Sequence, residues 1–169
     1  MTVSKAAFLL DTSPLSTLCA FPLHDIPYLH TVLNHADIIL TQEVIEEAGR
    51  GRIWRVVSPL LKSDMLKVLD TPHEPEILDL SYARDLGLGE RSIIKTALTE
   101  QITPILDDKD AFIVACRFGL RPLGFQDFIV SLAKTSGLSK DLAMDIVTTS
   151  ASQYPRMYLA HSVYMLKED

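Results

Sequence analysis

The chain has 169 residues, a formal net charge of −6 and 47% hydrophobic residues. Such an apolar composition excludes a disordered chain, and the negative charge excludes broad electrostatic attraction to a polyanion, so a nucleic-acid-binding role requires local basic patches. We expect a single domain over residues 1–169, because the length is typical of one domain and no repeat, linker or low-complexity segment divides it.

The cysteines and the N-terminus bear on the cellular compartment. Cys19 and Cys116 are the only cysteines and lie far apart in the sequence, which matches neither a disulfide framework nor a zinc pattern. The apolar run near the N-terminus is interrupted by Asp11, too early for a signal-peptide core or a membrane-spanning helix. We therefore expect a cytoplasmic protein without a membrane partner.

The first predicted element is a buried strand over residues 6–10, a short continuous apolar run that stops at Asp11. Ser13 followed by Pro14 predicts the start of a helix, with Ser13 as the cap. This is the first of several strand-to-helix steps in the chain.

A second such step follows. The residue pattern predicts a strand over residues 37–41 and a helix over residues 42–48, with Gly49 at the position where a helix would end. Residues 59–66 then predict a helix and residues 67–69 a short strand.

The third step contains two adjacent acids. Residues 88–101 carry apolar side chains at helical spacing, and residues 104–106 form a short apolar run that ends at Asp107 and Asp108. A helix is predicted over residues 111–118. The order of strand, acidic turn and helix thus occurs again.

The remaining segment is mostly helical. Residues 123–125 predict a last strand, residues 128–135 and 140–150 predict helices, and the apolar tail at 157–166 has an ambiguous period that suits core packing, an edge cover or a dimer contact.

Together these elements predict an α/β fold. Strands that alternate with helices imply a mostly parallel sheet of four or five strands with helices on both faces. We expect the core at about residues 6–125 and a helical C-terminal extension at about 126–169.

Several acidic residues are predicted to meet at one edge of this sheet. Asp11, Asp107 and Asp108 follow strands, and ligands of open α/β sheets gather outside the carboxyl ends of the strands. Glu47 and Glu90 lie on helices that can reach the same edge. Because crowded carboxylates repel one another, such a cluster indicates a bound cation, and hard oxygen ligands select Mg²⁺ or Mn²⁺.

Other common active-site motifs are missing from the sequence. It has no glycine-rich phosphate loop, no paired-histidine zinc motif and no G-x-S-x-G element. This favours two-metal chemistry, in which an ion activates a water and both ions stabilise the charge that develops on an in-line phosphodiester.

Four short motifs carry a family resemblance. They are found in order between Phe8 and Gly124, at residues 10–15 (LDTSPL), 44–47 (VIEE), 89–94 (GERSII) and 106–111 (LDDKDA). The chain resembles PIN-domain proteins, notably short prokaryotic ones that begin D-T-S-P-L and nucleases similar to VapC toxins.

The resemblance implies a Rossmann-like three-layer PIN fold, dependence on Mg²⁺ or Mn²⁺, cleavage of RNA, and often a toxin role with an antitoxin partner and a homodimer. By motif position, Asp11 resembles the first metal ligand, Glu47 the second acid, Glu90 the third and Asp108 the fourth. Asp107 is an alternative to Asp108.

Our leading hypothesis is therefore a metal-dependent endoribonuclease. In it Asp11, Glu90 and Asp108 bind the catalytic ion, and Glu47 supports a second ion or the attacking water. The alternatives are a PIN-like binding or regulatory module without catalysis, and a phosphohydrolase or nucleotide-binding domain on the same sheet.

Structural roles compete with several of these assignments. Asp11 is also suited to capping a helix, and Glu90 in a first turn is favoured by the helix dipole. Glu46 is an alternative to Glu47, since one residue rotates the side chain by about 100° on a helix. Related sequences often carry small residues where this chain has Phe125-Gln126-Asp127, so the resemblance does not assign the residues at the outer rim of the site.

One segment interleaves basic and aromatic residues. Arg50, Arg52 and Arg55 surround Trp54, a pattern that can hold a phosphate backbone and stack a base, and Lys109 is a further candidate for RNA contact. The competing interpretation is a surface turn with Trp54 tucked into the core.

Overall fold

A four-stranded parallel sheet forms the centre of the protein. The computed structural model describes residues 5–49, 51–73, 83 and 85–168. The strand order is β5-β4-β1-β6, and every pairing is parallel. The strands are β1 (Ala6–Leu10), β4 (Ala36–Thr41), β5 (Lys67–Leu69) and β6 (Thr103–Ile105).

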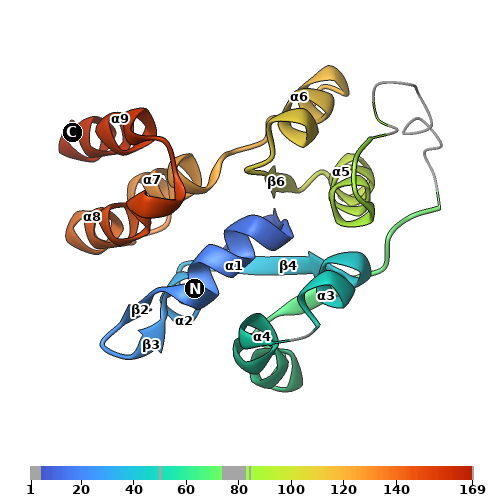
Figure 1. Cartoon of the computed structure of the whole chain (residues 1–169), viewed down its shortest axis with the longest axis horizontal. Helices are drawn as coiled ribbons and strands as arrows, with labels where there is room; N and C mark the ends of the chain where they lie inside the picture. The colour runs from blue at the N-terminus through green and yellow to red at the C-terminus, as the bar shows by residue number, and fades with distance from the viewer. Residues whose placement is uncertain (1–4, 50, 74–82, 84, 169) are drawn as a thin grey trace.

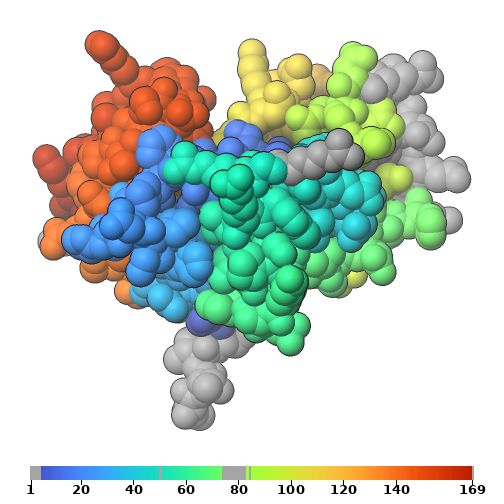
Figure 2. Space-filling model, turned by 60° about the horizontal axis from the view of Figure 1, so that its bottom comes forward, coloured from blue at the N-terminus to red at the C-terminus, as the bar shows by residue number. Residues whose placement is uncertain are grey.

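Helices flank this sheet and continue beyond it (Figure 1). The first group is α1 (Thr12–Ala20), α2 (Tyr28–Leu33), α3 (Gln42–Ala48), α4 (Arg52–Lys62), α5 (Leu88–Glu100) and α6 (Lys109–Arg117). The C-terminal group is α7 (Phe125–Thr135), α8 (Lys140–Thr149), a 3-10 helix (Ser150–Gln153) and α9 (Arg156–Lys167). These last helices pack on one another at one end of the molecule, on the orange and red side of Figure 2. The predicted α/β fold with a helical C-terminus is confirmed.

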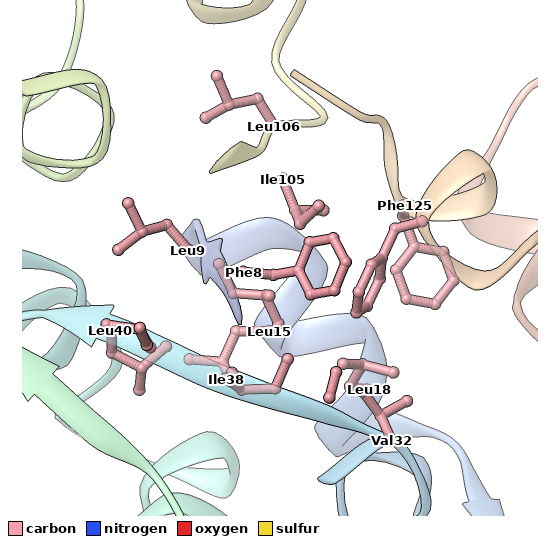
Figure 3. Close-up of a cluster of buried hydrophobic side chains, with 14 of the residues drawn as sticks. Phe8, Leu9, Leu15, Leu18, Val32, Ile38, Leu40, Ile105, Leu106 and Phe125 are labelled. Carbon is pink, nitrogen blue, oxygen red and sulfur yellow. The ribbon is translucent and has the colours of Figure 1, made fainter. Parts of the chain in front are cut away.

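The core lies between the sheet and its helices (Figure 3). Leu9 and Leu10 of β1 are fully buried, as a central strand covered on both faces should be. Phe8 meets Phe128 of α7 edge to face, with ring centroids 4.9 Å apart. This contact anchors the C-terminal helices to the sheet. The labelled core side chains in Figure 3 include Leu15, Leu18, Val32, Ile38, Leu40 and Ile105.

The path of the chain creates a switch point beside β1. The chain passes from β1 to β4 and β5 on one side, and then returns to β6 on the other side of β1. Ligand sites of open α/β sheets lie at such reversals, outside the carboxyl ends of the strands. Asp11 directly follows β1, and its backbone N–H donates to the Ile105 carbonyl of β6 at 3.3 Å.

The predicted helix at residues 59–66 was placed too late in the sequence. The observed α4 runs from Arg52 to Lys62 and contains Pro59. Ile53, Val57 and Leu60 recur at i, i+4 and i+7 and face the core, so their burial outweighs the hydrogen bond that a proline removes.

Other boundaries also differ from the prediction. Helix α1 begins at Thr12 with Asp11 at its cap position, so Ser13 lies inside the helix. The strand predicted at 123–125 is a single bridge between Leu123 and Ile105, and α7 begins at Phe125. The hairpin β2 (Pro22–Leu23) and β3 (Ile26–Pro27) was not predicted, nor was α2, because these elements are too short for a periodic signal.

Within the described ranges, none of the helices combines the length and the apolarity needed to cross a bilayer.

Candidate functional site

A cavity of about 1360 Å³ opens at the carboxyl edge of the sheet, beside the switch point. Among the described residues, no Lys or Arg lines it, and His161 is the only lining side chain that can become positively charged. Seven carboxylates line the cavity: Asp11, Glu47, Asp85, Glu90, Asp107, Asp108 and Asp127. They come from segments far apart in the sequence, so the fold gathers negative charge here.

Asp11 lies deepest, with only 5% of its surface exposed. It occupies the cap position of α1, but its carboxylate makes no capping hydrogen bond, so capping does not explain this residue. Burial raises the pKa of Asp11 to about 7, against the opposing effect of the Thr12 backbone N–H. The negative charges of Glu90, Glu47 and Asp107 raise this pKa further.

Glu47 joins three elements at the edge of the cavity. Its carboxylate accepts from the Thr12 hydroxyl at 2.6 Å and from the Gly89 backbone N–H at 3.0 Å. Only a glycine allows so close an approach, since a Cβ at position 89 would lie 2.7 Å from Oε2 of Glu47. The neighbouring Glu46 instead accepts a hydrogen bond on the protein surface, from the side-chain amide of Gln42 at 3.4 Å. The structure therefore brings Glu47, and not Glu46, to the cavity.

Glu90 sits in the first turn of α5, where the sequence placed it. Its Oε2 accepts from the Gly87 backbone N–H at 2.8 Å, which satisfies one of the free donors at the helix start. Burial raises the pKa of Glu90, the Gly87 hydrogen bond lowers it, and the charges of Asp108, Glu47 and Asp110 raise it. Glu90 thus has a structural contact and also shares the repulsion of the cluster.

Asp107 and Asp108 have different surroundings. Oδ1 of Asp108 accepts from the backbone N–H groups of Asp110 and Ala111, both at 2.9 Å, so Asp108 caps α6. Asp107 is half-buried and its charge acts on Asp11. Of the two acids, Asp107 does not cap α6 and its charge acts on Asp11, whereas the charge of Asp108 acts on Glu90.

Two of the three hydrogen bonds to Asp107 come from the C-terminal half of the chain. Its Oδ1 accepts from the Phe125 backbone N–H at 2.8 Å, and its Oδ2 accepts from the Tyr154 hydroxyl at 2.8 Å. Burial raises the pKa of Asp107, and hydrogen bonds from Phe125, Tyr154 and Ser13 lower it. Burial and the charge of Asp107 also raise the pKa of the Tyr154 phenol, which therefore stays a donor.

The sequence analysis did not assign Asp85, Asp127 or Tyr154 to this cavity. Asp85 and Asp127 line it, although neither directly follows a strand, and Tyr154 reaches it from just before α9. Asp127 falls within the string Phe125-Gln126-Asp127 noted above, whereas no local sequence signal marks Tyr154.

The residues predicted to contact RNA lie elsewhere. Arg52 donates to the Ala20 carbonyl at 3.0 Å, Trp54 is half-buried beside a shallow second pocket, and Arg55 and Lys109 are exposed. None of these four lines the acidic cavity. Arg50 lies outside the described residues.

The cavity suits a hydrated divalent cation. Carboxylate oxygens are the donors that Mg²⁺ and Mn²⁺ prefer, and a cation between them relieves the repulsion that raises their pKa values. In the part of the chain that the structure describes, no three His, Cys, Asp or Glu side chains form a group that could hold a metal ion. Mg²⁺ usually keeps several waters and binds one or two carboxylates plus substrate phosphates, so the donor set fits in that manner.

Comparison with known proteins identifies the family. A family model described as PIN domain matches residues 7–165. Among solved structures, PAE2754 from Pyrobaculum aerophilum superimposes with a TM-score of 0.54 at 20% identity, covering 77% of this chain and 91% of that one. No curated protein is matched. The arrangement of an acidic cavity at the sheet edge, together with the match over almost the whole sequence, shows that the chain belongs to the PIN-domain family.

Proposed function

We propose that this PIN domain is a metal-dependent endoribonuclease that hydrolyses phosphodiester bonds in its acidic cavity. The observation that carries the proposal is a cavity lined by seven carboxylates and, among the described residues, by no Lys or Arg. A polyanionic substrate is repelled by such a site unless cations neutralise it. A divalent ion is therefore needed for a phosphodiester to enter.

The carboxylates we assign to the ion are Asp11, Glu90 and Asp107, with Asp108 as the alternative to Asp107. One or two of them would contact the ion directly and the others through its bound waters. When bound, the ion activates a water and stabilises the charge that develops on the phosphate. Burial of Asp11 limits its contact with solvent, so its carboxylate has few competing water contacts. Glu47 is held in place by Thr12 and Gly89, which supports a fixed role beside the ion.

The proposal is tested by incubating the purified chain with labelled single-stranded RNA in Mg²⁺, in Mn²⁺ and in EDTA. We expect cleavage with either ion and none in EDTA. The same protein is assayed with small phosphate monoesters and diesters. Hydrolysis of the esters without RNA cleavage would favour a phosphohydrolase, and Mn²⁺ binding without any hydrolysis would favour a binding module, and either result would overturn the proposal.

Gly89→Ala is expected to displace the Glu47 carboxylate without unfolding the protein. The new Cβ would lie 2.7 and 2.8 Å from the two oxygens of Glu47, but these are the end of a flexible side chain that can swing away. Isothermal titration calorimetry should show Mn²⁺ affinity reduced by about 10-fold. The control is Gly87→Ala, whose Cβ would lie 3.7 Å from Oε2 of Glu90, an ordinary contact. Equal affinity in both variants would contradict a role for Glu47.

Tyr158 is expected to stack on a base of the bound RNA. It is 52% exposed on α9 and lines the cavity, where the described lining offers no Lys or Arg for phosphate contacts. Tyr158→Ala should weaken the binding of single-stranded RNA by about 5- to 150-fold, since stacking contributes ~1–3 kcal/mol per base. Fluorescence anisotropy in an Asp11→Asn background, which prevents cleavage, measures this.

Tyr164→Ala is the control for this measurement, because Tyr164 is 57% exposed on the same helix but does not line the cavity. The RNA affinity of the Tyr164→Ala variant should match that of the Asp11→Asn protein in which it is made. Equal losses in the two variants would assign the effect to α9 as a whole, and no loss in either would remove Tyr158 from the RNA site.

The toxin role, an antitoxin partner and a homodimer stay predictions of the resemblance. RNA contact by Arg52, Trp54, Arg55 and Lys109 stays a prediction of the sequence pattern of basic and aromatic residues. Growth arrest on expression of the chain, abolished by Asp11→Asn, would support a toxin. Analytical ultracentrifugation decides between monomer and dimer.

A further inference from the structure

The C-terminal extension reaches the acidic cavity through Tyr154. This residue lies between the 3-10 helix Ser150–Gln153 and α9, and its backbone N–H donates to the Ala151 carbonyl at 3.2 Å. Pro155 follows it and disfavours a helical backbone at the residue before it, in agreement with the extended angles φ −130° and ψ 155° of Tyr154. The backbone is thus held on both sides of this side chain.

The side chain of Tyr154 is held as firmly as its backbone. Its ring stacks on Phe125 with centroids 5.3 Å apart and an interplanar angle of 0°. Its hydroxyl lies 2.8 Å from Oδ2 of Asp107 and 3.0 Å from the Thr17 hydroxyl of α1. The phenol therefore links α1, the turn after β6 and the C-terminal extension at one point.

Both oxygens of Asp107 are held by residues beyond the sheet. Phe125 donates its backbone N–H to Oδ1 and Tyr154 donates its hydroxyl to Oδ2, each at 2.8 Å. A carboxylate offers about four lone-pair sites, so these two hydrogen bonds, together with the one from Ser13, fix its orientation and still leave a site for a cation. Asp107 lines the cavity in this orientation, together with Asp11.

We infer that Tyr154 is a positioning residue, which holds the Asp107 carboxylate in the orientation that serves the cavity. The C-terminal extension is then part of the functional site. The expected effect on a metal ion rests on the proposed function. Hydrogen-bond partners of ligating carboxylates orient them, and removal of such a partner typically reduces metal affinity by about 10- to 100-fold.

The chain offers a matched control for this contact. Tyr28 is buried, with 1% of its surface exposed, and donates its hydroxyl to Oδ2 of Asp145 at 2.7 Å. Neither Tyr28 nor Asp145 lines the acidic cavity. Tyr28→Phe thus removes the same kind of hydrogen bond at a place where no effect on a bound ion is expected.

The test measures Mn²⁺ affinity of the full chain by isothermal titration calorimetry. Tyr154→Phe keeps the ring on Phe125 and should weaken Mn²⁺ binding by about 10-fold, whereas Tyr28→Phe should leave it unchanged. In an Asp107→Asn background, Tyr154→Phe should have no further effect, because the residue acts through Asp107. Wild-type affinity in Tyr154→Phe, an equal loss in Tyr28→Phe, or an undiminished loss in the double variant would each overturn the inference.

A second measurement separates this inference from the proposed function. If the wild-type chain binds no Mn²⁺, the proposed function fails, but the crystal structure of metal-free Tyr154→Phe still tests the positioning. We expect Oδ2 of Asp107 to leave its wild-type position once its donor is removed. An unmoved Asp107 carboxylate would overturn the inference.

Discussion

Asp11→Asn should abolish metal-dependent RNA cleavage and also stabilise the metal-free protein at pH 8. Burial raises the pKa of Asp11 from 3.8 to about 7, which corresponds to a cost of about 4 kcal/mol for the buried charge at ~1.4 kcal/mol per pKa unit. The asparagine carries no charge, although its amide is still buried. We expect the free energy of unfolding to rise by about 2–4 kcal/mol in EDTA.

The pH dependence of this gain follows from the direction of the shift. Since the pKa of Asp11 is higher in the folded than in the unfolded chain, the folded state retains the proton between about pH 4 and pH 7. The destabilisation of the wild-type protein by the buried charge of Asp11 is therefore absent below about pH 4 and complete above about pH 7. Urea denaturation should therefore show a large difference between variant and wild type at pH 8 and little difference at pH 4.

Asp141→Asn is the control for both measurements. Asp141 is exposed in the first turn of α8 and does not line the cavity, so its replacement should change stability by less than about 0.5 kcal/mol and leave cleavage intact. Retained cleavage in Asp11→Asn would remove Asp11 from the site. A destabilised variant at pH 8 would show that the Asp11 carboxylate is not buried at a cost.

The acidic edge of the sheet could be predicted from the sequence because it depends on local patterns. Short apolar runs mark the buried strands, and the carboxyl ends of parallel strands meet at one edge, which places Asp11 and Asp107 together. Glu90 could be placed because the helix pattern of α5 is strong. These residues lie within one or two positions of an element boundary, where sequence patterns are informative.

The partners of these acids could not be predicted, because they depend on packing between distant segments. Tyr154 lies 47 residues from Asp107 and meets it only after the C-terminal helices have packed on the sheet. The choice between Asp107 and Asp108 depends on which side chain turns toward the start of α6. The contact between Glu47 and Gly89 likewise depends on how α3 packs against α5.

Mn²⁺ is expected to stabilise the wild-type chain, and to do so more strongly at pH 8 than at pH 6. An ion that binds only the folded state adds about 2.7 kcal/mol at a concentration 100 times its Kd, which raises Tm by roughly 5–10 °C for a domain of this size. Protons and the ion compete for Asp11, whose pKa is about 7 in the metal-free protein. Below pH 7 more of this carboxylate is protonated, so the Kd for Mn²⁺ rises and the gain in Tm shrinks.

A general attraction of Mn²⁺ to this chain of net charge −6 would also raise Tm, and the Asp11→Asn variant separates the two causes. If the ion binds in the cavity, the Asp11→Asn variant should lose most of the Tm gain, and the gain that remains should not depend on pH between 6 and 8. Attraction to the surface would persist in the variant and weaken with added NaCl, because salt screens exposed charges. An equal Tm rise in both proteins at every pH would place the ion outside the cavity and contradict the proposed site.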